Sequence, residues 1–82
     1  VNEMKLVMDD VIGKRENSVA VIWLCVRFIG DRVDAYTRTF YKSTGADTGY
    51  TYVGSYEPFN GISALEMLKT DAKYRKNFVL ND

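Results

Sequence analysis

The feature that most constrains this fold is an apolar stretch joined by a glycine-containing turn to a second strand-like stretch. Residues 19–29 read VAVIWLCVRFI and residues 32–41 read RVDAYTRTFY, with Gly30-Asp31 between them. Val, Ile, Trp and Phe favour strands, and Gly at the first central position of a two-residue loop suits the turns that close hairpins. The sequence therefore predicts an antiparallel hairpin over residues 18–41.

The two-residue turn sets the register of this hairpin. It brings together two pairs that were not used to choose it. Arg27 meets Asp34 with opposite charge, and Trp23 meets Arg38, whose guanidinium can lie on the indole ring. A shift by one residue would lose both pairs and mix the two faces of the sheet. The predicted pairs nearest the turn are Ile29 with Arg32 and Phe28 with Val33.

The register also sorts the hairpin side chains into two faces. One face is mostly aliphatic, and we expect it to form the core beneath a C-terminal helix, with Ile22, Leu24 and Val26 buried there. The other face gathers aromatic rings and cations, the residue types that are enriched in interface hot spots. Its predicted members are Trp23, Tyr36, Arg38 and Phe40.

Composition limits the classes of function. Eighty-two residues predict a single small domain over residues 1–82, and eleven basic residues balance eleven acidic ones. This balance argues against strong nonspecific attraction to nucleic acid or membranes. The chain has no histidine, which excludes Ser-His and Cys-His catalysis and the usual zinc sites. We therefore expect no enzyme, metal or cofactor. The single Cys25 and the lack of a signal-like segment are typical of a cytoplasmic protein.

Before the hairpin, residues 2–12 have the spacing of an amphipathic helix. Its predicted N-cap is Asn2, and Gly13 follows as the residue that ends it. The alternative is an edge strand over residues 4–8, and residues 14–17 are predicted to be a charged connector. The predicted apolar face of the helix consists of Met4, Val7, Met8, Val11 and Ile12.

After the hairpin, residues 49–56 (GYTYVGSY) alternate with period two and predict a third strand. Gly54 indicates a bulge or a close contact. Ser63 to Glu66 has the form of a capping box, which predicts a helix that runs to about Lys76 with a break near Thr70-Asp71. The tyrosines of this strand all occupy even positions, so they should lie on one face of the sheet. We predict that the Trp23 face carries Tyr50, Tyr52 and Tyr56.

The predicted fold is therefore α+β: a three-stranded antiparallel sheet flanked by an N-terminal and a C-terminal helix, in the order α-β-β-β-α. Double-stranded RNA-binding domains share this order, but the basic start of their last helix is not matched by residues 60–68, NGISALEML. The order of elements is shared by many unrelated functions. We therefore assign no family.

Two surfaces are candidates for function. The first is the aromatic sheet face, unless the N-terminal helix or the C-terminal tail covers it as a second core. The second is a basic patch around Tyr74, whose cations could instead complement a helix dipole. We expect a regulator, inhibitor or adaptor that binds another protein or a second copy of itself; the alternative is a nucleic-acid-binding module that uses both surfaces. The predicted binding residues are Trp23, Tyr36, Arg38, Phe40, Tyr50 and Tyr52, and the basic patch is Lys69, Lys73, Arg75 and Lys76.

Overall fold

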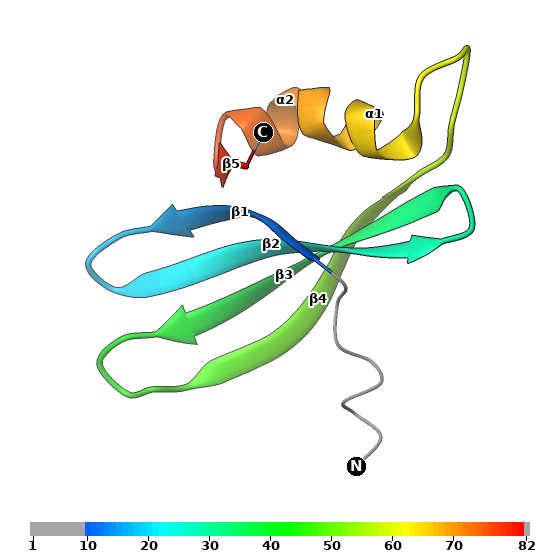
Figure 1. Cartoon of the computed structure of the whole chain (residues 1–82). Helices are drawn as coiled ribbons and strands as arrows, with labels where there is room; N and C mark the ends of the chain where they lie inside the picture. The colour runs from blue at the N-terminus through cyan, green and yellow to red at the C-terminus, as the bar shows by residue number, and fades with distance from the viewer. Residues whose placement is uncertain (1–9, 82) are drawn as a thin grey trace.

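The computed structural model describes residues 10–81. In this part of the chain a twisted five-stranded antiparallel sheet carries two short helices on one of its faces (Figure 1). The strand order is β4-β3-β2-β1-β5. The elements are β1 (Asp10–Glu16), β2 (Ala20–Ile29), β3 (Arg32–Tyr41), β4 (Asp47–Tyr56), α1 (Ala64–Thr70), α2 (Ala72–Arg75) and β5 (Val79–Leu80).

The predicted hairpin is confirmed as β2 and β3, and its register is confirmed along its whole length. Gly30 has φ of 62°, whereas Asp31 does not have a positive φ. This is the requirement of a type II′ turn, in which only the first central residue adopts a positive φ. Pairing continues from the turn as far as Ala20 opposite Tyr41. The turn therefore sets which side chains share each face.

The predicted three-stranded α-β-β-β-α architecture is wrong. Residues 10–12, assigned above to the end of an N-terminal helix, lie in strand β1, and residues 14–16 of the predicted connector lie there too. The remainder of that helix prediction, residues 2–9, falls outside the described residues. The long strand β2 offers its free edge to this segment, and the ladder to β2 outweighs the helical spacing of Val11 and Ile12.

A bulge explains why the apolar spacing of β1 resembled that of a helix. Val11 pairs with Cys25 and Gly13 pairs with Leu24, so that Ile12 is the extra residue between them. An extra residue interrupts the strict alternation of side chains along the strand. Ile12 therefore reaches the core, although its neighbour Val11 faces the opposite side of the sheet. A period-two search therefore fails in this strand.

The fifth strand is two residues long and depends on Gly13. Strand β5 pairs with β1 through Gly13 with Leu80 and Lys14 with Val79. A Cβ atom at position 13 would lie 2.7 Å from Leu80 Cδ2 and 3.2 Å from the carbonyl oxygen of Val79. Gly13 thus allows the C-terminal strand to approach, in place of the helix-ending role that we predicted.

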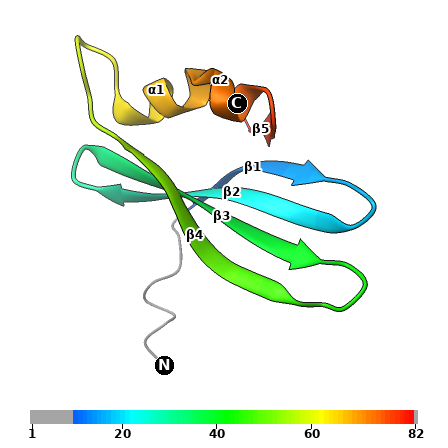
Figure 2. The same ribbon diagram turned by 180° about the vertical axis from the view of Figure 1, so that it is seen from behind.

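The C-terminal helical segment agrees with the sequence. The side chain of Ser63 accepts a hydrogen bond from the backbone N–H of Glu66 (3.2 Å), as a capping residue does. The segment breaks at Asp71, which ends α1 and caps α2. Both helices lie on the same side of the sheet in both views (Figures 1 and 2), and we call the sheet face beneath them the inner face. The buried core there consists of Ile12, Leu24, Val26, Val33, Ala35, Ala64, Leu68 and Tyr74, whereas the predicted core residue Ile22 is only partly buried.

A second bulge divides the tyrosines of β4 between the two faces. Tyr52 pairs with Tyr36 and Gly54 with Ala35, so Val53 is the extra residue. Tyr56 therefore pairs with Val33 and packs against the core, contrary to its predicted place on the Trp23 face. The position of the bulge beside Gly54 agrees with the expectation drawn from that glycine.

Candidate functional site

The sheet face turned away from the helices carries a cluster of aromatic rings. The register places side chains from β2, β3 and β4 there, because paired residues lie on the same side of a sheet. No helix or strand of residues 10–81 covers this side in either view (Figure 2). We call it the aromatic face, and we define it by Trp23, Tyr36, Arg38, Phe40, Tyr50 and Tyr52, all of which the sequence assigned to one face.

The tyrosines of the aromatic face pack against one another. The ring of Tyr36 lies between its two neighbours, with centroids 6.4 Å from Tyr50 and 5.7 Å from Tyr52 and interplanar angles of 78° and 72°. Edge-to-face contacts of this kind are the favoured geometry of aromatic pairs. The rings are therefore already ordered, although Tyr52 is still 56% exposed.

Arg38 has a different partner from the one predicted. Its guanidinium binds Asp47, with Nε 2.9 Å and Nη2 2.6 Å from Oδ2 of the carboxylate, and it lies 5.2 Å from the centre of the Tyr50 ring rather than on Trp23. The bond to Arg38, followed by the backbone N–H of Gly49, holds the pKa of Asp47 below its usual value. The same pairing raises the pKa of Arg38. This cation is therefore neutralised on the face where it lies.

Arg27 and Asp34 occupy paired positions on β2 and β3, as predicted, but they do not form an ion pair. Asp34 is buried, and its carboxylate accepts a hydrogen bond from Ser55 (2.9 Å) and lies 3.2 Å from Nε of Arg32. The Ser55 hydroxyl and the Arg32 guanidinium compensate the negative charge of Asp34. Burial of this carboxylate without such partners would be unfavourable. Arg27 remains a cation at the border of the aromatic face.

Cys25 lies among these side chains but is not a reactive thiol. It is buried, and this burial raises its pKa above the ordinary value. The nucleophilic form of cysteine is the thiolate, which a raised pKa makes scarce at neutral pH. Cys25 therefore acts as a small packed side chain.

Two exposed valines extend the aromatic face and were not predicted. Val11 pairs with Cys25 and is 51% exposed, and Val79 pairs with Lys14, which itself pairs with Trp23. Val79 is 77% exposed. Both lie on strands that sequence reasoning missed. The apolar run at residues 78–80, which follows the predicted C-terminal helix, is the sequence signal that could have indicated β5.

The predicted basic patch lies in the helical layer, on the opposite side of the sheet from the aromatic face (Figure 1). Tyr74, its predicted centre, is buried in the core. Lys73 turns toward the sheet, where its Nζ donates to the carbonyl oxygen of Val53 (3.3 Å) and lies 5.1 Å from the centre of the Tyr74 ring. Arg75 and Lys76 are exposed at the end of α2, and Lys69 is partly buried in the last turn of α1. The structure does not join the two predicted surfaces.

Residues 10–81 contain no group of three or more His, Cys, Asp or Glu side chains placed to hold a metal ion. Among the same residues, neither helix has the length and apolar character needed to cross a membrane.

Comparison of the chain with models of known protein families gives no match, and comparisons with curated proteins and with solved structures give none either. The functional conclusion therefore rests on the geometry of the two sheet faces.

Proposed function

We propose that this chain is a small non-enzymatic protein-binding module that recognises its partner through the aromatic face. The observation that carries the proposal is a cluster of five aromatic rings on a sheet face that no described helix covers. Extended apolar patches on small domains mark interaction surfaces. A regulator, inhibitor or adaptor uses such a surface without performing chemistry.

The geometry of the rings favours tight binding. Because Tyr36, Tyr50 and Tyr52 already contact one another, little side-chain entropy remains to be lost when a partner docks. Four long strands present a footprint of roughly 20 by 30 Å, or about 600 Å². A standard interface buries about 800 Å² per partner, so a partner would have to cover most of this face.

The charges favour a protein partner over nucleic acid. Arg38 is bound to Asp47, and Lys14 and Lys42 both lie within ion-pair distance of Glu16, at 3.4 and 2.7 Å. Phosphate binding would have to compete with these carboxylates. The basic patch lies on the other side of the sheet, so a nucleic-acid strand would have to pass around the edge of the sheet to contact both surfaces. The partner we propose is a protein chain that offers an apolar surface with little net charge.

The first experiment is sedimentation equilibrium of the chain alone, which shows whether a second copy is the partner. If the chain is monomeric, proteins are captured from native lysate with and without nuclease and titrated calorimetrically. Trp23→Ala should weaken the association by at least about 2 kcal/mol, or about 30-fold. The matched control is Phe59→Ala, which removes a 72% exposed ring from the turn before α1.

Two results would contradict the proposal. Equal affinity of Trp23→Ala and the parent would move the interface away from the aromatic face. Loss of the partner on nuclease treatment, together with a steep fall of affinity with salt, would indicate nucleic acid instead. Melting curves of both variants show whether Trp23 belongs to the folded core.

A further inference from the structure

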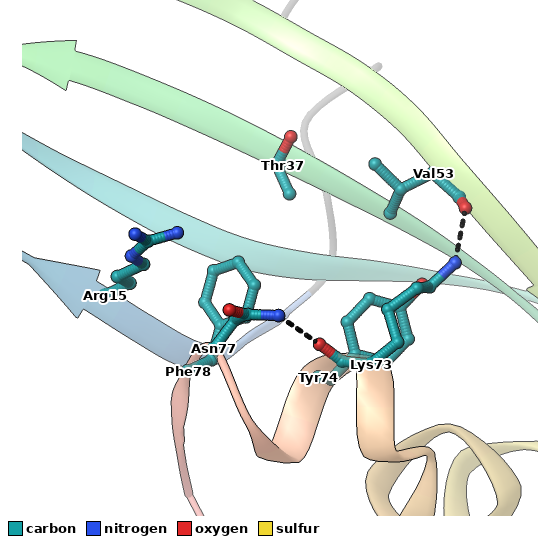
Figure 3. Close-up of a pocket in the computed structure, with 7 residues that line it drawn as sticks. All are labelled: Arg15, Thr37, Val53, Lys73, Tyr74, Asn77 and Phe78. Carbon is teal, nitrogen blue, oxygen red and sulfur yellow. Dashed lines mark hydrogen bonds between the residues drawn. The ribbon is translucent and has the colours of Figure 1, made fainter.

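A groove of about 420 Å³ lies between α2 and the inner face of the sheet (Figure 3). Its volume is within the range of small-molecule sites. It is on the opposite side of the sheet from the aromatic face, so it is independent of the proposed protein interface. Its lining residues are Arg15, Thr37, Val53, Lys73, Tyr74, Asn77 and Phe78.

The sheet and the helical segment each supply one wall. Arg15 pairs with Ile22 and Thr37 pairs with Leu24, which places both on the inner face. Val53 joins them because it is the bulged residue of β4. The other wall comes from α2 and the residues that follow it, as Figure 3 shows. Lys73 links the two walls through its bond to the carbonyl oxygen of Val53.

The groove is electropositive. Two of its lining residues, Arg15 and Lys73, are cations, and none is acidic. Within residues 10–81, Arg15 has no hydrogen-bond or ion-pair partner, in contrast to the paired cations Arg38 and Lys42. An unpaired guanidinium keeps its full set of donors and binds carboxylate or phosphate oxygens in a two-pronged geometry.

The rest of the lining is suited to the body of a small molecule. The rings of Phe78 and Tyr74 lie 6.4 Å apart, and the side chain of Val53 adds an aliphatic surface. Asn77 donates through Nδ2 to the carbonyl oxygen of Lys73 (2.8 Å), and its side-chain oxygen remains an acceptor. A few polar groups on a mostly apolar lining are the usual composition of a ligand site.

We propose that this groove binds a small organic anion, with the negative group held by Arg15 and a flat apolar body packed against Phe78 and Val53. Both a carboxylate and a phosphate monoester have this chemistry. Lys73 adds positive potential from the opposite wall. Binding of an anion in this groove requires neither a partner chain nor any residue of the aromatic face.

The test is a titration of the ¹⁵N-labelled chain by heteronuclear NMR with three probes of similar body: benzoate, phenyl phosphate and benzyl alcohol. The anions should shift the amide signals of residues around the groove, with dissociation constants on the order of 1–10 mM for fragments of this size. The neutral alcohol should bind more weakly than either anion. Stronger binding of phenyl phosphate than of benzoate would identify the phosphate as the preferred group, and the reverse order would identify the carboxylate.

The matched variants are Arg15→Gln and Arg27→Gln. Both remove an exposed or partly exposed cation from a strand, but only Arg15 lines the groove. Arg15→Gln should weaken the binding of both anions about fivefold or more and leave the alcohol unchanged. Arg27→Gln should bind all three probes as the parent does. Equal affinity for anions and alcohol, anion binding that is unaffected by Arg15→Gln, or the absence of shifts at the groove would overturn the proposal.

Discussion

The hydrogen bond between Tyr56 and Asp71 gives the sharpest test of how the helical layer is fastened to the sheet. Oη of Tyr56 donates to Oδ2 of Asp71 over 2.6 Å and joins the end of β4 to the residue that caps α2. Tyr56→Phe removes this bond and keeps the ring, whose centroid lies 6.3 Å from that of Tyr74. The variant therefore isolates one hydroxyl group.

The expected loss at pH 7 is about 1 kcal/mol. Hydrogen bonds to charged groups contribute about 1.5–3 kcal/mol, but this carboxylate is half-buried and competes with water, so we take a lower value. For a domain of this size the loss corresponds to a fall of about 4–8 °C in Tm. The assay is urea unfolding, followed by the fluorescence of Trp23. Tyr52→Phe is the control, because its exposed hydroxyl forms no hydrogen bond among the described residues.

The pH dependence of this loss has a defined sign. The hydroxyl of Tyr56, followed by the backbone N–H of Lys73, holds the pKa of Asp71 below its usual value of 3.8. A lowered native pKa contributes stability that is present above the unfolded-state value and is lost as the pH falls through the native value. The difference between parent and Tyr56→Phe should therefore be largest near neutral pH and should narrow progressively as the pH falls below 3.8.

Asp71→Asn completes a double-mutant cycle, because asparagine retains the ability to cap α2. Tyr56→Phe should cost less when it is combined with Asp71→Asn than when it is made in the parent. A cost below about 0.3 kcal/mol at pH 7 would refute the reasoning, as would a cost that does not fall as the pH is lowered from 7 to about 2.

Two further predictions concern the core. Leu24 is fully buried in the core of the inner face, so Leu24→Ala should lower the free energy of unfolding by about 2–5 kcal/mol, and a melting temperature within a degree or two of the parent would show that this face is not the core. The hydroxyl of Tyr74 is buried and has no hydrogen-bond partner among the described residues. Tyr74→Phe should therefore leave the stability in urea unchanged or raise it by up to about 1 kcal/mol, whereas a clear loss would reveal a partner for that hydroxyl.

What could be predicted from the sequence is the part of the fold that local chemistry determines. The Gly30-Asp31 turn sets its own register through backbone conformation, and Ser63 caps a helix three residues from Glu66. Parity along β2, β3 and the middle of β4 then assembles the aromatic face without tertiary information. The alternation of side chains along the strands is therefore sufficient to predict which residues form the aromatic face.

What could not be predicted depends on pairing between distant segments. Residues 10–16 become a strand because β2 offers an edge, and β5 forms because Gly13 leaves room for it. A bulge between Arg38 and Phe40 brings Asp47 to the arginine, so the partner of Arg38 depends on β4 rather than on the hairpin. These preferences are set by contacts that no short window of sequence contains.

The bulge at Val53 has a consequence for how this protein could change by insertion or deletion. One additional residue in β4 divides a run of alternating tyrosines, so that Tyr50 and Tyr52 face outward while Tyr56 fastens the helices. Loss of a single codon at this position would turn Tyr56 outward, break its bond to Asp71 and remove Val53 from the wall of the groove. A substitution in β4 can change one surface at a time. A change in the length of β4 would alter the aromatic face, the groove and the Tyr56–Asp71 hydrogen bond together.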